Sequence, residues 1–143
     1  IEIVERSKDI IYYYQIKPIM KHRFISKSVE AHLGKGVQKI LLEDSEYVFQ
    51  ITHPDDKDTM SKKLSDELDY TKPIRQRFRS TDGEYIWFEE YITPVYRNGQ
   101  LVAIQGILRN INEKKLLEEE LQYQIFLSLC NTIPKILLSI LLH

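Results

Sequence analysis

Cysteine is nearly absent from this sequence, which has Cys130 as its single cysteine among 143 residues. One cysteine excludes an intrachain disulfide framework and a cysteine-rich zinc site, and it agrees with a reducing compartment. Glycine and proline are scarce as well, with 5 of each, whereas 43% of the residues are hydrophobic. Such a composition is typical of a globular protein rather than a disordered chain, and the length predicts one domain with its own core.

The sequence also lacks an excess of either charge. Its 20 lysine and arginine residues oppose 21 aspartate and glutamate residues, for a formal net charge of −1. This balance does not favour nucleic acid or an anionic membrane as a partner. A nucleophile–base pair, a phosphate-binding glycine loop and a metal-ligand cluster are all missing at motif spacing. We therefore expect a chain that is not an enzyme and that binds neither a metal nor nucleic acid.

The most informative stretch runs from Pro73 to Asn112. Two turn signals, Thr-Asp-Gly at 81–83 and Asn-Gly at 98–99, divide it into three runs rich in β-branched and aromatic residues, which predicts a three-stranded antiparallel meander. Two earlier runs, 10–16 and 22–26, predict a hairpin. After Asn112 the sequence is charged with helical spacing, which predicts an exit helix.

The region between the hairpin and the meander predicts helices. Residues 29–33 form one short helix and residues 36–47 contain another, whereas Met60, Leu64 and Leu68 lie at i, i+4 and i+8 and predict a longer helix with a narrow buried stripe. Strands and helices in this order predict an α+β fold: a five-stranded antiparallel sheet with the helices inserted between the second and third strands and covering one face.

Alternation within the strands indicates which side chains face the core. The third strand carries a row of arginines on one face, so the face with Gln76 and Phe78 must be buried. In the fourth strand we favour the side with Phe88 and Glu90 as the core, which leaves Trp87 and Tyr91 on the outer face.

From about residue 10 to about residue 121, the sequence resembles the PAS domains with a PAC-type C-terminal motif. The matching residues are His53-Pro54-Asp55-Asp56, Arg77, Asp82-Gly83, Trp87, Pro94, Asn98-Gly99, Gly106 and the terminal stretch Asn110-Ile111-Asn112-Glu113-Lys114-Lys115. The family's usual ending is Asp-Ile-Thr followed by Glu-Arg-Lys. Here Asn110 replaces the acid and Asn112 the threonine, so we expect neutral hydrogen bonds at the strand-to-helix junction, with Asn112 as a cap of the exit helix.

The resemblance implies a sensory module of a bacterial signalling protein, such as a histidine kinase or a diguanylate cyclase. In such a module a small ligand or a partner shifts the exit helix, which relays the signal to an effector in the same polypeptide. We expect an entry helix or cap at 1–9, the PAS domain at 10–112, the exit helix at 113–130, and the start of a following module or a tail at 131–143. The alternative is a structural dimerisation module with a filled core.

The identity of a cofactor stays open, but flavin and haem are not expected. A light-oxygen-voltage photoreceptor needs a cysteine among the short helices, whereas Cys130 lies beyond the domain. A haem-binding PAS domain typically uses a histidine on the long helix, and residues 55–70 contain none. His22 and His32 are more simply interpreted as hydrogen-bonded structural residues. For His53 we expect a structural role in the loop, with Asp55 or Asp56 capping the long helix.

Glu90 is the best candidate for a polar group in a ligand pocket, because an inward carboxylate needs a partner and Gln76 lies on the neighbouring strand. The alternative is a solvated Glu90 at the edge of the sheet. The candidate pocket residues are Phe24, Phe49, Gln76, Phe78, Phe88, Glu90 and Leu108.

Exposed aromatic residues on a sheet mark a surface that something else covers. We expect Trp87 and Tyr91 to dock a second subunit or a terminal helix, and Leu117 and Leu121 of the exit helix to form a seam in a homodimer. Intramolecular packing onto the sheet is the alternative. The apolar tail from Ile125 is interrupted by Pro-Lys at 134–135, so we expect a dimer interface or disorder there rather than a membrane span. The expected location is the cytoplasm, although the parent protein can be membrane-attached. The lack of an initiator methionine and a signal peptide indicates a fragment.

Overall fold

The computed structural model describes residues 8–142, and the chain divides into two compact units, Ile1–Ile111 and Asn112–His143. The entry helix or cap predicted for residues 1–9 lies outside the described residues except for Lys8 and Asp9.

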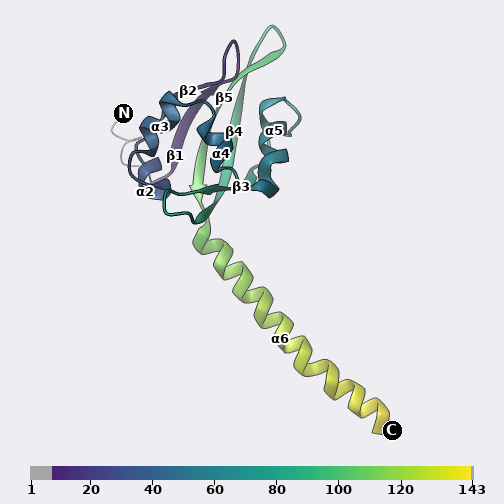
Figure 1. Cartoon of the computed structure of the whole chain (residues 1–143). Helices are drawn as coiled ribbons and strands as arrows, with labels where there is room; N and C mark the ends of the chain where they lie inside the picture. The colour runs from purple at the N-terminus through teal and green to yellow at the C-terminus, as the bar shows by residue number, and fades with distance from the viewer. Residues whose placement is uncertain (1–7, 143) are drawn as a thin grey trace. The chain divides into compact units, whose positions relative to one another are not determined.

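A five-stranded antiparallel sheet forms the body of the first unit (Figure 1). Its strands lie in the order β2-β1-β5-β4-β3. Their bounds are β1 Ile10–Gln15, β2 Lys21–Ile25, β3 Ile74–Arg79, β4 Tyr85–Arg97 and β5 Gln100–Asn110. The predicted hairpin and meander are both present, and β1 and β5 pair along their length to join them. The predicted α+β fold is therefore confirmed.

The helices between β2 and β3 cover one face of this sheet (Figure 1). Their bounds are α2 Val29–Leu33, α3 Val37–Glu43, α4 Tyr47–Ile51, the 3-10 turn η1 Pro54–Asp56 and α5 Lys57–Leu64. Leu68 was predicted to continue the buried stripe of Met60 and Leu64 along this helix. That prediction is wrong, because α5 ends at Leu64. Asp66 adopts a left-handed conformation with φ 63°, which terminates a helix.

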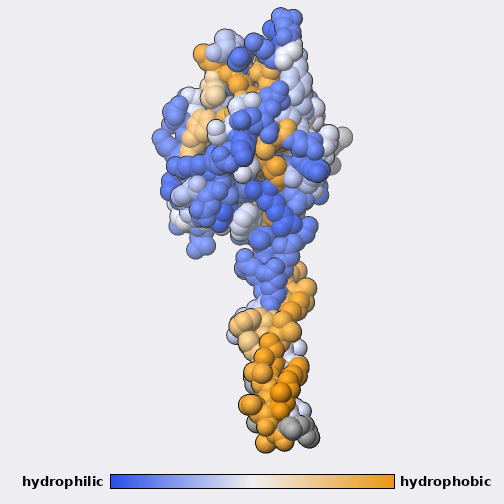
Figure 2. All heavy atoms as spheres, turned by 90° about the vertical axis from the view of Figure 1, so that its right-hand side faces the viewer, coloured by the Kyte–Doolittle hydropathy of each residue, from blue (hydrophilic) through white to orange (hydrophobic). Residues whose placement is uncertain are grey.

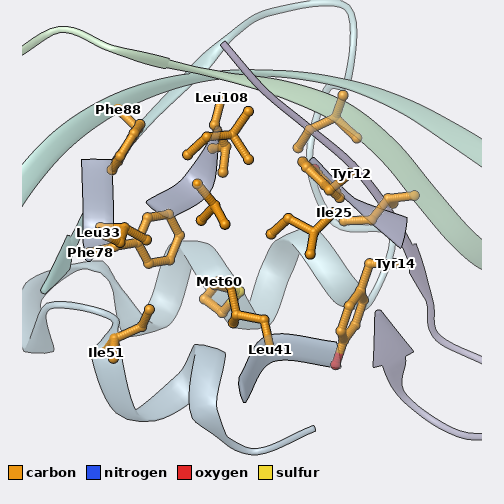
Figure 3. Close-up of a cluster of buried hydrophobic side chains, with 14 of the residues drawn as sticks. Tyr12, Tyr14, Ile25, Leu33, Leu41, Ile51, Met60, Phe78, Phe88 and Leu108 are labelled. Carbon is orange, nitrogen blue, oxygen red and sulfur yellow. The ribbon is translucent and has the colours of Figure 1, made fainter. Parts of the chain in front are cut away.

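The core fills the space between the sheet and these helices (Figure 3). Tyr12 and Tyr14 point into it from β1, Phe78 from β3 and Phe88 from β4, and Met60 closes it from α5. The prediction that the Phe78 and Phe88 faces are buried is confirmed, since both side chains are almost fully inaccessible.

The second unit is a single helix, α6, from Asn112 to Leu142. The exit helix expected at residues 113–130 lies within α6, and the backbone remains helical through residues 131–142. Its first turns are charged, and its later turns expose hydrophobic side chains (Figure 2). By length and composition alone α6 could cross a membrane, although the Pro-Lys pair argued against that from the sequence.

Candidate functional site

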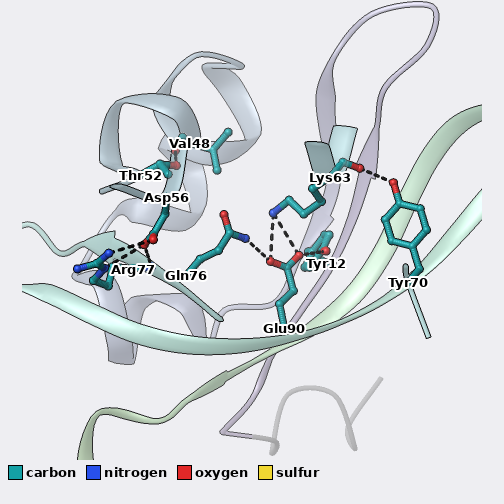
Figure 4. Close-up of polar contacts among 9 residues, drawn as sticks. All are labelled: Tyr12, Val48, Thr52, Asp56, Lys63, Tyr70, Gln76, Arg77 and Glu90. Carbon is teal, nitrogen blue, oxygen red and sulfur yellow. Dashed lines mark hydrogen bonds and ion pairs between the residues drawn. The ribbon is translucent and has the colours of Figure 1, made fainter. Parts of the chain in front are cut away.

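A buried carboxylate is the most unusual group in the domain. Glu90 is 1% exposed, so the alternative of a solvated edge position is wrong. Its Oε1 accepts a hydrogen bond of 2.8 Å from Nε2 of Gln76, the partner that the sequence suggested. Lys63 Nζ lies 3.1 Å from Oε1 and 3.2 Å from Oε2, and the Tyr12 hydroxyl donates to Oε2 (Figure 4). We call these four residues, Tyr12, Lys63, Gln76 and Glu90, the Glu90 cluster.

Four elements bring the Glu90 cluster together. Alternation along β4 points Glu90 to the helix-covered face, while Lys63 reaches the carboxylate from the last turn of α5. Gly106 of β5 lies opposite Tyr12 of β1. A Cβ at position 106 would lie 2.8 Å from the Tyr12 hydroxyl and 2.6 Å from the carbonyl oxygen of Tyr91. A glycine at this position therefore leaves Tyr12 the room to reach Glu90.

The protonation of Tyr12 follows from its burial. Burial raises the pKa of Tyr12 well above its usual value, and the Glu90 charge raises that pKa further. Tyr12 therefore keeps its proton and acts as a donor at neutral pH. Three donors surround a carboxylate that water does not reach, and Lys63 supplies the opposite charge. Burying such a pair is costly unless its hydrogen bonds are satisfied, and here both carboxylate oxygens are.

Three members of the Glu90 cluster, Tyr12, Lys63 and Glu90, line a cavity of about 40 Å³. Apolar side chains from the sheet and the helices make most of the lining, including Ile25, Leu41 and Met60. Two further polar residues, Tyr14 and His22, line the same cavity. Burial lowers the pKa of His22 to about 4, and the nearby Lys63 charge adds to this effect, so the imidazole is neutral at pH 7.

The predicted pocket residues separate into three groups. Phe78, Glu90 and Leu108 line the cavity. Gln76 and Phe88 are buried beside it without lining it. Phe24 and Phe49 lie elsewhere, and their assignment to the cavity is wrong. Phe24 pairs with Tyr13 across the bulged β1–β2 ladder and is 45% exposed, while Phe49 lines a separate hollow with Met20 and Lys57.

Sequence reasoning missed Tyr12, Tyr14, His22 and Lys63. Alternation in β1 contained the signal for the tyrosines, since Ile10, Tyr12 and Tyr14 share one face. No comparable signal marked Lys63, which sits among charged residues on a helix with a narrow apolar stripe. Only its three-residue spacing from Met60 places it toward the core.

The outer face of β3 and β4 is organised around Arg77. Its guanidinium stacks on the Trp87 ring at 4.3 Å from the centroid. Its Nε donates to Asp56 Oδ2 and its Nη2 donates to Asp56 Oδ1, each at 3.0 Å. The backbone N–H of Arg77 also donates to Asp56 Oδ2, at 2.7 Å. Burial alone would raise the pKa of Asp56, but these side-chain and backbone hydrogen bonds from Arg77 outweigh it and hold the pKa below its usual value.

Asp56 occupies the N-cap position of α5, one of the two positions predicted, but its side chain makes no capping hydrogen bond there because its carboxylate binds Arg77. Instead His53 Nδ1 accepts a hydrogen bond of 3.0 Å from the backbone N–H of Asp55 and caps η1. The expectation of a structural role for His53 agrees with this bond.

The remaining predicted residues lie at the surface and at the junction. Tyr91, Leu117 and Leu121 are exposed, whereas Trp87 is partly covered by Arg77. Nδ2 of Asn110 lies 3.1 Å from Nδ1 of His32, a side-chain contact of the kind expected for the junction.

The backbone N–H of Ile111 donates to the Trp87 carbonyl at 2.9 Å, and α6 begins at the next residue, Asn112. Within residues 8–142, no group of three or more His, Cys, Asp and Glu side chains is arranged to hold a metal ion.

Comparisons with known proteins agree with this geometry. A family model described as the PAS fold matches residues 22–108, more than half of the chain. The N-terminal domain of a diguanylate cyclase with a PAS/PAC sensor from Marinobacter aquaeolei superposes with a TM-score of 0.61 at 20% identity, covering 75% of this chain and 98% of that one. A sensory box histidine kinase/response regulator from Burkholderia thailandensis gives 0.64 at 18% identity, covering 86% and 92%.

A third structure, a domain of a putative light and redox sensing histidine kinase from Haloarcula marismortui, gives a TM-score of 0.57 at 21% identity, covering 77% of this chain and 95% of that one. Among curated proteins none matches the sequence. At these identities the solved structures support the fold and not a particular ligand.

Proposed function

This chain belongs to the PAS fold family, and from that membership we propose that it senses a small ligand or a partner and relays the signal through α6 to an effector in the same polypeptide. PAS domains are sensory, non-catalytic modules of signalling proteins, and the solved relatives include sensors of diguanylate cyclases and histidine kinases. A relay from the cavity to α6 would run through the contacts of the Glu90 cluster.

The Glu90 cluster carries the proposal because it ties the cavity to the strand that leads into α6. Glu90 is the cross-strand partner of Leu108 on β5, and Leu108 lines the cavity. Three residues before Glu90, the Trp87 carbonyl accepts from Ile111, directly before α6. A change in the hydrogen bonds of Glu90 therefore acts on β4 and β5, whose pairing continues to Asn110 and Ile111, directly before the helix.

We assign roles to the surface residues on the same basis. Asn110 and Asn112 form the junction, and residues 113–130 act as the signalling helix, which continues through residues 131–142 rather than ending where a following module was expected. The PAS domain itself comprises residues 10–112. A cytoplasmic location suits a module of this kind.

A dimerisation module without a ligand is the second candidate. It is favoured by exposed hydrophobic residues at Tyr91 and Ile107 on the sheet and by the exposed Leu117 and Leu121 on α6. Native mass spectrometry after gentle purification separates the two functions. A retained small molecule is the expected result for the sensor, whereas an empty dimer supports the dimerisation module.

The relay is tested with Glu90→Gln, which keeps the size of the side chain and removes its charge. Because Lys63 and Tyr12 then lose their anionic partner, we expect faster hydrogen exchange in β5 and in the first turns of α6, measured by mass spectrometry on the full chain. Glu89→Gln is the matched control, since Glu89 points to the outer face beside Arg75. Equal exchange in the two variants across residues 105–118 would refute the relay.

A further inference from the structure

Two polar groups in the cavity are not satisfied by the protein. Within the part of the chain that the structure describes, neither the Tyr14 hydroxyl nor Nδ1 of His22 has a hydrogen-bond partner. Both residues are more than nine-tenths buried, with exposed fractions of 3% and 6%. Their rings pack edge to face with centroids 4.7 Å apart, and both residues line the cavity together with Leu41. Unpaired polar atoms this deep are costly, so a bound group that hydrogen-bonds to both atoms would be favoured there.

The hydrogen-bonding capacity of the two groups is defined by their protonation. The Leu41 backbone acts on the pKa of His22 as a hydrogen-bond acceptor. Because Nδ1 is without a partner, we assign this bond to Nε2 as the donor. The neutral imidazole then presents Nδ1 as an acceptor. Burial raises the pKa of Tyr14 to about 12, so its hydroxyl keeps a proton to donate. A complementary group must donate to Nδ1 and accept from Tyr14, which is what one hydroxyl does.

The charges of the cavity favour an uncharged molecule. The buried ions that line it, Lys63 and Glu90, already neutralise each other at 3.1 Å. A ligand with a net charge would add an unpaired charge to this interior, at a large desolvation cost.

The volume of the cavity limits the size of the molecule that it can bind. A cavity of about 40 Å³ has room for about three water molecules. That space suits a short apolar body against Ile25 and Met60 with a hydroxyl at the Tyr14 and His22 end.

We propose that the cavity binds small uncharged alcohols, with the ligand hydroxyl donating to His22 Nδ1 and accepting from the Tyr14 hydroxyl. This ligand class rests on the proposed sensory function and adds to it the chemistry of the signal. Tyr14 and His22 recognise the hydroxyl, and the Glu90 cluster on the adjoining wall responds to occupancy.

The test is a titration of the full chain with 2-propanol and with acetone, followed by amide chemical shifts in nitrogen–proton NMR spectra. The two probes have the same number of non-hydrogen atoms, but acetone accepts hydrogen bonds without donating them. We expect saturable shifts at residues 12–14 and 22–25 with 2-propanol and about 10-fold weaker binding of acetone, because acetone leaves Nδ1 of His22 unpaired.

Tyr14→Phe is expected to weaken 2-propanol binding about 10-fold, and the matched Tyr13→Phe, on the opposite face of β1, is expected to leave it unchanged. Equal affinity for the two probes, equal effects of the two variants, or shifts that do not saturate with either probe would overturn the ligand class; a water-filled polar cavity would give the last result. The Glu90→Gln exchange experiment uses no ligand, so the ligand class can fail while the relay stands.

Discussion

At the scale of single residues, Lys63 and Glu90 decide the character of the interior. A buried ion pair is a poor source of stability, because the desolvation of both ions offsets most of their attraction. Removing one partner is different, since it leaves the other ion buried without compensation. Here both partners are nearly inaccessible, so we expect the intact pair to add little net stability and the loss of one partner to cost much more.

Lys63→Met tests this reading at nearly constant side-chain volume. We expect the free energy of unfolding to fall by about 3–5 kcal/mol in urea titrations, because Glu90 is left without its cation. The matched control is Lys62→Met on the same helix. Lys62 forms a surface pair with Asp58 and is half exposed, so a loss below about 1 kcal/mol is expected there.

The double variant Lys63→Met with Glu90→Leu supplies the decisive comparison. Replacing both ions with apolar groups removes the uncompensated charge, so the double variant should be more stable than Lys63→Met alone. A double variant less stable than the single one would contradict the desolvation argument.

At the scale of elements, one arginine joins the helical layer to the sheet. Arg77 of β3 binds Asp56 of η1 through two guanidinium bonds, and the same guanidinium lies flat on Trp87 of β4. Planarity is needed for both contacts at once, and lysine cannot supply it. This explains why a residue on the arginine face of β3 contributes to the fold even though the side chain is not in the core.

Arg77→Lys should therefore lower the free energy of unfolding by about 1–2 kcal/mol, although the charge is kept. Arg79→Lys is the matched control on the same face of β3, and Arg79 is exposed. Thermal melts of the two variants at equal ionic strength provide the comparison. Indistinguishable melting temperatures would show that the two guanidinium hydrogen bonds to Asp56 and the stacking on Trp87 contribute nothing to stability.

At the scale of the whole molecule, the two units differ in how much of their apolar side-chain surface is exposed to water. The first unit buries a continuous core, whereas the described side chains of α6 beyond Gln124 are exposed and mostly apolar, including Ile133, Ile136 and Leu137. A helix that is apolar on every side is normally surrounded by protein or lipid. In aqueous buffer the apolar side chains of this helix can be removed from water by packing against another copy of the same chain.

A chain that ends at Gln124 should then behave differently from the full chain. We expect the full chain to self-associate in sedimentation velocity runs at micromolar concentration and the shortened chain to remain monomeric. The thermal melt of the domain should be the same in both, because the core lies within the first unit. Leu137→Lys in the full chain serves as a point control and should reduce association. A monomeric full chain would show that the apolar turns do not drive assembly.

The sequence by itself determined the five strands, their antiparallel pairing and the buried faces of β3 and β4, because alternation and turn residues are local signals. It also placed Glu90 beside Gln76, since neighbouring strands of a meander share a face. Phe24 was wrongly expected in the pocket because the β1–β2 ladder contains a bulge that shifts the register, and no residue nearby in the sequence indicates this bulge. The sequence extended the α5 stripe to Leu68 because nothing in the spacing marks Asp66 as left-handed.

Only the tertiary structure decided where the chemistry lies. Lys63 is one of several charged residues on α5, and its selection depends on how that helix sits over Glu90. Tyr14 and His22 meet because β1 and β2 pair beneath α3, and their unpaired atoms become visible only when every neighbour is in place. Local patterns define strands and faces, whereas the contacts of Glu90 with Lys63 and Tyr12 join residues 27 and 78 positions apart. The physical reason is that such contacts are formed by packing, which no short window of sequence contains.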